Sequence, residues 1–140
     1  MFNPSREQVR EFLAGAWNKY CSGLPLTGAE PQVIEIILLH PEYHQLLANS
    51  VDSIQREFTP ETGQMNPFLH LSLHLAIEEQ IAIDQPSGIR AEFQRIQEKS
   101  HDRHAALHSA IECLGEMIWR AQRDSSPPDG VAYMNCLRRR

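Results

Sequence analysis

The sequence predicts an all-α fold, a compact single-domain helical bundle of six or seven helices. Three observations lead to this prediction. Apolar residues recur at helical spacing along most of the chain, caps and prolines mark helix starts, and no segment shows a strand pattern that finds a partner. A chain of 140 residues is long enough for one hydrophobic core, so we expect residues 1–140 to form one domain.

The first two helices are predicted from their N-terminal residues. Asn3 is a good cap, and Pro4 fits a first helical turn because its missing N–H has no partner there. Apolar residues then recur at helical spacing, which predicts a helix over 4–22. Thr27–Glu30 resembles a capping box in which Glu30 reaches back to the cap. The helix that follows is apolar nearly all round, which predicts burial.

Proline and polar residues divide the next part of the chain. Pro41 starts a new turn well, so residues 41–57 should form a further helix that is broken near Asn49–Ser50. The segment 59–63 reads Thr-Pro-Glu-Thr-Gly, which predicts a loop.

The second half of the chain contains the longest predicted helices. Asn66–Pro67 repeats the cap-plus-proline arrangement and opens the most apolar helix, over 67–83. A more polar helix is expected at about 89–99, a long one at 102–123, and a short one at about 130–138. The residues of the polar helix that should face inward are Ile89, Phe93 and Ile96.

The charge of the chain limits the classes of partner. The formal net charge is −5 with neutral histidine, so nucleic-acid binding has no global electrostatic support. The only basic run is Arg138–Arg140, which we interpret as a solvated tail. No stretch approaches the ~18 uninterrupted apolar residues of a membrane span. We therefore expect neither a nucleic acid nor a membrane as partner.

The expected location of the protein is cytoplasmic. The first residues lack the apolar core of a signal peptide. The cysteines Cys21, Cys113 and Cys136 are odd in number, far apart and outside any CxxC motif. We expect free, packed thiols here, and neither a disulfide scaffold nor a thiolate zinc site.

Histidine and glutamate recur at intervals of four in two apolar segments. The segments are HLSLHLAIE, residues 70–78, and HAALHSAIE, residues 104–112, which agree at six of nine positions. Positions i, i+4 and i+8 of a helix drift by only ~80° around its axis, so each triplet lies on one face. The six candidate metal ligands are His70, His74, Glu78, His104, His108 and Glu112.

Two arrangements would satisfy these polar side chains if they are buried, because an unpaired buried charge is very costly. One is a divalent transition metal such as zinc, iron, manganese or nickel, which imidazole and carboxylate ligands suit. The other is a hydrogen-bond network, in which antiparallel helices pair each glutamate with a histidine. Parallel helices would instead crowd Glu78 against Glu112 and require a cation or a shared proton. The reversing helix at 89–99 favours the parallel arrangement.

Other polar residues have weaker patterns. His40 and His44 are four residues apart, but Pro41 starts a helix between them, so the two rings need not share a face. We expect a capping or surface role for this pair in preference to ligation. Glu35 lies within the apolar second helix and should need a partner.

Several segments together resemble a known family. They read MFNPSR, HPEYH, NPFLHLSLHLAIEEQ, DRHAALH, ECLGEMIW and PPDG, and they cover essentially the whole chain. The chain is similar to the bacterial family catalogued as domain of unknown function 1841, which implies a small bacterial protein and assigns no functional residue. In architecture it also resembles the DinB and hemerythrin-like metal bundles, although their ligand spacings differ from HxxxHxxxE.

The function predicted from these observations is that of a cytoplasmic helical bundle whose buried His/Glu centre binds one or two transition metals. A catalytic centre would use a metal-activated water with a carboxylate as its base, and a non-catalytic centre would sense or store metal. Catalytic residues are not identified. The alternative is a metal-free interaction or structural module with an unknown protein partner. A homodimer with the stripes at its interface is a third arrangement.

Overall fold

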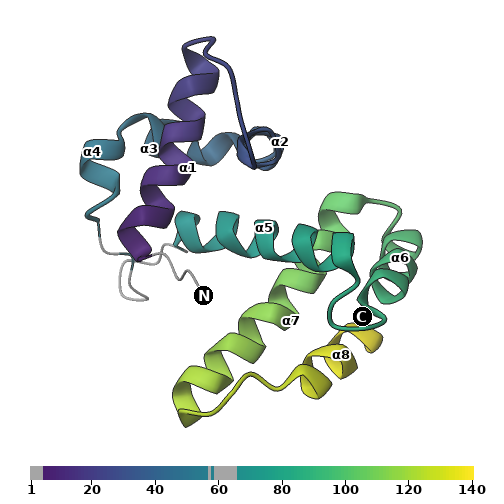
Figure 1. Ribbon diagram of the computed structural model, residues 1–140. Coiled ribbons are helices and arrows are strands. Elements are labelled where there is room, and N and C mark those ends of the chain that lie inside the picture. The colour runs from purple at the N-terminus through teal and green to yellow at the C-terminus, as the bar shows by residue number, and fades with distance from the viewer. Residues whose placement is uncertain (1–4, 57, 59–65) are drawn as a thin grey trace. The chain divides into compact units, whose positions relative to one another are not determined.

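The chain folds into helices, as seen in the computed structural model, which describes residues 5–56, 58 and 66–140 (Figure 1). No strand occurs among these residues, so the all-α class is confirmed. The elements are α1 (Arg6–Cys21), α2 (Glu30–Leu38), the 3-10 helix η1 (Pro41–Tyr43), α3 (His44–Ala48), α4 (Ser50–Ser53), α5 (Pro67–Ile83), α6 (Ile89–Ser100), α7 (Arg103–Asp124) and α8 (Gly130–Arg138).

The helix starts follow the predicted chemistry with small shifts. Ser5 caps α1 through a reciprocal box with Gln8, whereas the predicted cap Asn3 lies outside the described residues. Glu30 does reach back to Thr27, whose backbone N–H donates to it at 2.8 Å, although α2 begins at Glu30 itself. This hydrogen bond and the ion pair with Lys19 lower the pKa of Glu30.

The predicted break between helices near residue 49 is also present. Helix α3 ends just before Asn49, and helix α4 begins just after it. The 3-10 helix η1 forms the turn that Pro41 opens. The loop predicted at 59–63 lies outside the described residues. The broken helix expected over 41–57 is therefore present between residues 41 and 53 as three short helical elements.

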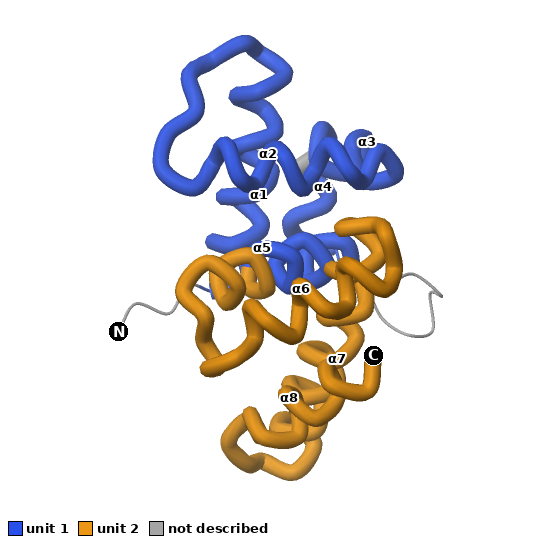
Figure 2. The backbone as a smooth tube through the Cα atoms, turned by 90° about the vertical axis from the view of Figure 1, so that its right-hand side faces the viewer, with its two compact units in different colours: residues 1–75 blue, residues 76–140 orange. Residues whose placement is uncertain are grey.

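Contacts divide the chain into two compact units, residues 1–75 and 76–140 (Figure 2). Helix α5 belongs to both, because the division falls after Leu75. In the first unit α1 packs against α2 and α3. Its core consists of Leu13, Ala14, Ala16, Trp17, Val33, Ile34, Ile36, Ile37, Leu47, Phe68 and Leu71.

Helix α2 buries one face and leaves the other open to solvent. Val33, Ile34 and Ile37 are buried, whereas Leu38 and Leu39 are exposed. Glu35 is exposed as well, so the expectation that it needs a buried partner is wrong. The nine-residue helix is therefore amphipathic: one face packs on the core, and the exposed face includes apolar residues. It is not buried all round, although its apolar sequence predicts this.

The first unit also buries a cation. The Arg10 side chain is 1% exposed, and its Nη1 donates to the carbonyl oxygens of Ile54 at 2.9 Å and Arg56 at 2.8 Å. Its guanidinium lies 4.8 Å from the ring centroid of Phe68. Arg10 therefore connects α1 to the segment after α4 and to the start of α5.

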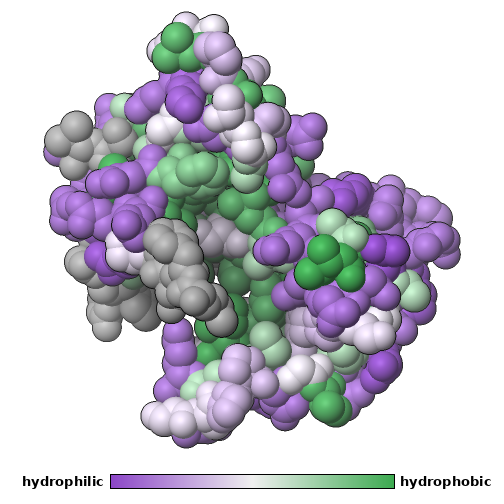
Figure 3. Space-filling view, in the orientation of Figure 1, coloured by the Kyte–Doolittle hydropathy of each residue, from purple (hydrophilic) through white to green (hydrophobic). Residues whose placement is uncertain are grey.

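In the second unit α6, α7 and α8 pack against one another. The inward residues of α6 are Ile89, Phe93 and Ile96, as predicted, and the surface around α6 at the right of Figure 3 is mostly hydrophilic. The Tyr133 hydroxyl donates to Gln80 Oε1 at 2.6 Å, and burial raises the pKa of this phenol. No helix within the described ranges is long and apolar enough to cross a membrane.

A disulfide joins α7 to α8, which corrects the expectation of free thiols. Cys113 and Cys136 are bonded, with their Cα atoms 5.8 Å apart, and only Cys21 is a free, exposed cysteine. The turn after α7 folds α8 back along it and brings together two residues that are 23 positions apart. The cysteines therefore no longer support a reducing compartment.

The burial of Arg10 leads to a prediction about stability. We expect Arg10→Met to lower the free energy of unfolding by about 2 kcal/mol, because two hydrogen bonds from a buried charged donor are lost. Arg90→Met is the matched control, since exposed Arg90 also donates to two backbone carbonyls, those of Ile81 and Ala82. It should cost less than about 1 kcal/mol. The free energies of unfolding are measured from urea unfolding curves. Equal decreases for the two variants would show that the burial of Arg10 does not add to its contribution.

Candidate metal centre

The first unit brings three imidazoles together. Asn66 caps α5 by accepting from Leu69 N at 3.2 Å, and Pro67 occupies the first turn of this helix. One helical turn apart on α5, His70 is 9% exposed and His74 is 0% exposed. His40, from the turn after α2, is 2% exposed and reaches the same point.

The structure agrees with one half of the role predicted for His40 and contradicts the other. A capping or surface role was expected for His40 and His44, and both rings do bond to carbonyl oxygens in the last turn of α2. A surface role is wrong for His40, which is buried and contacts His70. The reason is local. The chain turns at the end of α2, so that the His40 ring folds back beneath it and Nδ1 lies 2.8 Å from the Ile36 carbonyl oxygen.

This hydrogen bond fixes the tautomer of His40. A carbonyl oxygen only accepts, so Nδ1 of His40 carries the proton and donates it to Ile36. In a neutral imidazole the other nitrogen then has an unprotonated lone pair. Nε2 of His40 is therefore prepared as a metal ligand in the way that outer-shell carbonyls orient ligating histidines.

The contacts among the three rings cannot all be ordinary hydrogen bonds. Nε2 of His70 lies 3.2 Å from Nε2 of His40 and 3.2 Å from Nε2 of His74. A ring nitrogen has either one proton or one lone pair, so Nε2 of His70 makes at most one linear hydrogen bond with these two neighbours. A cation that accepts the lone pairs of all three rings would satisfy both contacts.

The spacing of these nitrogens suits a transition metal. Zinc binds histidine nitrogen at about 2.0–2.1 Å, so two ligands of a tetrahedral ion lie about 3.3 Å apart. The two measured Nε2 separations are 3.2 Å each. The rings meet edge to face, with interplanar angles of 76° for His40 with His70 and 76° for His70 with His74. The rings therefore lie in different planes, and Nε2 of His70 is close to the Nε2 atoms of the other two.

Aromatic residues support the segment that carries His40. The Tyr43 ring stacks parallel to His40, with centroids 5.3 Å apart, and lies edge-on to His70. Burial, and to a lesser degree Glu42, raises the pKa of Tyr43. His44 has different partners. It stacks on Trp17 at 4.3 Å, and its Nε2 lies 2.9 Å from the Ile37 carbonyl oxygen.

The second unit contains a separate pair of imidazoles. Asp102 caps α7 by accepting from His104 N, so the first turn of α7 presents His104 and the next presents His108. Their rings are 4.2 Å apart, and both residues are half-buried. Within the second unit, these two imidazoles form a second histidine pair on one helix face.

The two predicted glutamate ligands form ion pairs with arginine. Glu78 Oε1 lies 2.8 Å from Arg103 Nη1, and its side chain is largely shielded. Glu112 is exposed and lies 2.7 Å from Arg140 Nη1. Each carboxylate therefore already has a cationic partner within the second unit. Metal ligation by Glu78 and Glu112 stays a prediction.

Comparison with known proteins places the chain in a family. Nothing among curated proteins or solved structures matches it. The likeness to DinB and hemerythrin-like bundles is therefore not shown. One family model, described as "Domain of unknown function (DUF1841)", matches residues 5–139. Because that match covers nearly the whole sequence, the chain belongs to the DUF1841 family of unknown function.

Proposed function

We propose that this protein binds a divalent transition-metal ion in an all-imidazole centre built on His40, His70 and His74. The observation that carries the proposal is the pair of 3.2 Å separations that Nε2 of His70 makes with Nε2 of His40 and of His74. These separations match neighbouring ligands on one ion and do not suit two simultaneous hydrogen bonds.

The donor set points to a borderline metal. Imidazole suits zinc, copper, iron and nickel, whereas carboxylate and carbonyl oxygens suit magnesium, calcium and manganese. Glu78 and Glu112 have arginine partners, so the proposed centre contains nitrogen donors alone. Zinc is our first choice, because the nitrogen spacing fits a tetrahedral ion.

A metal-free network is the competing explanation of the same cluster. It was predicted to pair imidazoles with Glu78 and Glu112, yet both carboxylates accept from guanidinium groups. Within the His40, His70 and His74 cluster, a neutral network would leave one of the two contacts without a linear hydrogen bond. The number of hydrogen bonds that Nε2 of His70 can make therefore favours a cation over the network.

Metal content tests the proposal directly. Full-length protein, stripped with a chelator and re-equilibrated with Zn²⁺, should retain about one equivalent of zinc by elemental analysis after gel filtration. His40→Ala and His70→Ala should each weaken zinc binding by about tenfold or more, because each removes a core ligand. Circular dichroism should show that both variants keep their helix content.

Two control variants separate ligands from other histidines and from the glutamates. His101→Ala removes an exposed imidazole at the end of α6 and should leave zinc affinity unchanged. Glu112→Gln removes an exposed carboxylate and should also bind zinc normally. Zinc that stays bound with wild-type affinity in both His40→Ala and His70→Ala would reject the proposed ligand set. Loss of zinc in Glu112→Gln would restore the predicted role of that carboxylate.

A second prediction concerns stability. A ligand that binds only the folded state stabilises it by about 2.7 kcal/mol at a hundredfold excess over its Kd, so Zn²⁺ should raise the Tm of stripped protein. Equal concentrations of Mg²⁺ should not, because magnesium prefers oxygen ligands. Differential scanning calorimetry provides the readout. The proposal fails if Zn²⁺ shifts the Tm of the His40→Ala variant as much as that of the wild type.

A further inference from the structure

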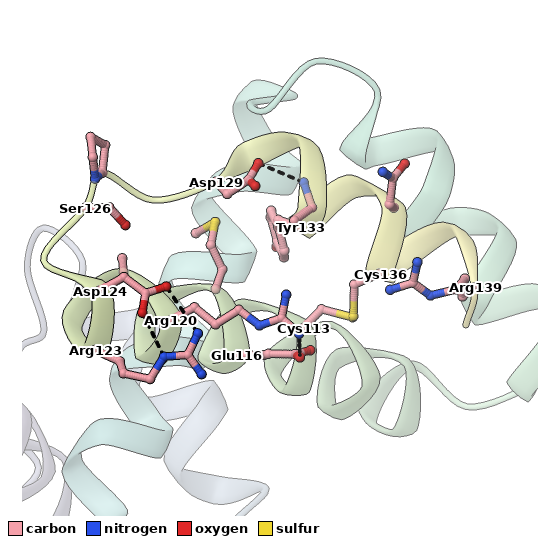
Figure 4. Close-up of a pocket in the computed structure, with 15 residues that line it drawn as sticks. Cys113, Glu116, Arg120, Arg123, Asp124, Ser126, Asp129, Tyr133, Cys136 and Arg139 are labelled. Atoms are coloured by element: carbon pink, nitrogen blue, oxygen red, sulfur yellow. Dashed lines mark hydrogen bonds and ion pairs between the residues drawn. A yellow bond between two sulfur atoms is a disulfide. The ribbon is translucent and has the colours of Figure 1, made fainter.

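A cavity in the second unit contains the Cys113–Cys136 disulfide in its wall. Its volume is about 400 Å³, and it lies between the C-terminal half of α7, the turn after it and α8 (Figure 4). That volume falls within the range of small-molecule sites. No part of the proposed metal centre lines this cavity.

The cavity wall carries charges of both signs. Arg120 pairs with Glu116 at 2.7 Å, and Arg123 pairs with Asp124 at 2.9 Å. The charged residues in the lining are Glu116, Arg120, Arg123, Asp124, Asp129 and Arg139. These three cations and three anions sum to zero formal charge, so a ligand that itself carries both signs fits better than a simple cation or anion.

The two cysteines of the disulfide differ slightly in exposure. Cys136 is 7% exposed and Cys113 is 1% exposed, although both line the cavity. Arg139, three residues after Cys136, extends toward the disulfide in Figure 4. Asp129 accepts from Ala132 N at the start of α8 and contributes a further carboxylate. We therefore choose Cys136, the more exposed residue of the pair and the one nearer to Arg139 in the sequence, as the point of attack by an incoming thiol.

We propose that this cavity is a thiol-exchange site that takes a small zwitterionic thiol, a molecule with one carboxylate, one ammonium group and one sulfhydryl. The guanidinium of Arg139 would bind the carboxylate, and the acidic side chains of the wall would bind the ammonium group. The proposal is independent of the metal centre, because it uses other residues.

The exchange reaction needs no outside oxidant, because one disulfide bond forms as another breaks. The incoming thiol loses its proton to solvent, and its thiolate attacks Sγ of Cys136. A new sulfur–sulfur bond forms there, and the bond to Cys113 breaks. The electron pair leaves on Sγ of Cys113, which takes up a proton from solvent. Attack by Cys113 on the mixed disulfide reverses the reaction and releases the thiol.

Three probe thiols of matched length test charge recognition. L-Cysteine carries both charges, cysteamine lacks the carboxylate, and 3-mercaptopropionate lacks the ammonium group. The protein is full-length with Cys21→Ser, which removes the exposed free thiol. Rates of disulfide opening are measured by alkylation and mass spectrometry. Each is divided by the rate of the same thiol with bis(2-hydroxyethyl) disulfide, which corrects for intrinsic reactivity.

We expect the normalised rate for L-cysteine to exceed those of the other two thiols by about threefold or more, with the adduct on Cys136. Arg139→Gln should lower the rates for L-cysteine and 3-mercaptopropionate by about threefold and leave cysteamine unchanged. Arg138→Gln is the matched control, because Arg138 is exposed, bonds to Asn135 and does not line the cavity. It should change none of the three rates.

Several results would overturn the proposal. Equal normalised rates for the three thiols would show that the cavity does not recognise charge. An adduct on Cys113, or equal effects of Arg138→Gln and Arg139→Gln, would place the reaction elsewhere. Opening by a phosphine reductant without opening by any thiol would show that thiols do not enter. Purified protein with both cysteines as free thiols would remove the site altogether.

Discussion

The hydrogen bond from His40 Nδ1 to the Ile36 carbonyl oxygen governs the chemistry of the candidate centre. It places the single proton of a neutral ring on one side and leaves the lone pair of Nε2 facing His70. Nε2 of His70 also lies 3.2 Å from Nε2 of His74, so the three imidazoles form one cluster. The proposed metal ion would accept lone pairs from all three rings of that cluster.

The fold supplies this arrangement from two well-defined elements. Helix α5 holds His70 and His74 one turn apart, and its start is fixed by Asn66 and Pro67. The end of α2 places His40 against them, with Tyr43 stacked on its ring. Helix geometry and a backbone hydrogen bond thus position these side chains, which is how a preorganised centre is built.

Much of the fold could be predicted from periodicity and caps, because these signals are local. The bounds of α5, the inward face of α6 and the break at Asn49 all follow from nearby residues. The HxxxH spacing likewise identified His70 and His74 as one stripe. His40 was misjudged because its burial depends on how the chain turns after α2. The arginine partners of Glu78 and Glu112 and the Cys113–Cys136 bond join residues 23 to 28 positions apart, and no local pattern encodes such pairings.

Long-range ¹H–¹⁵N spectra of the histidine rings test the central claim most directly, because they report which nitrogen carries the proton. In chelator-stripped protein, the account predicts His40 as the Nδ1–H tautomer, with Nε2 unprotonated. Addition of Zn²⁺ should then shift the Nε2 resonances of His40, His70 and His74 together, while those of His101 stay in place. A proton on Nε2 of neutral His40, or unchanged spectra after Zn²⁺ addition, would contradict the account.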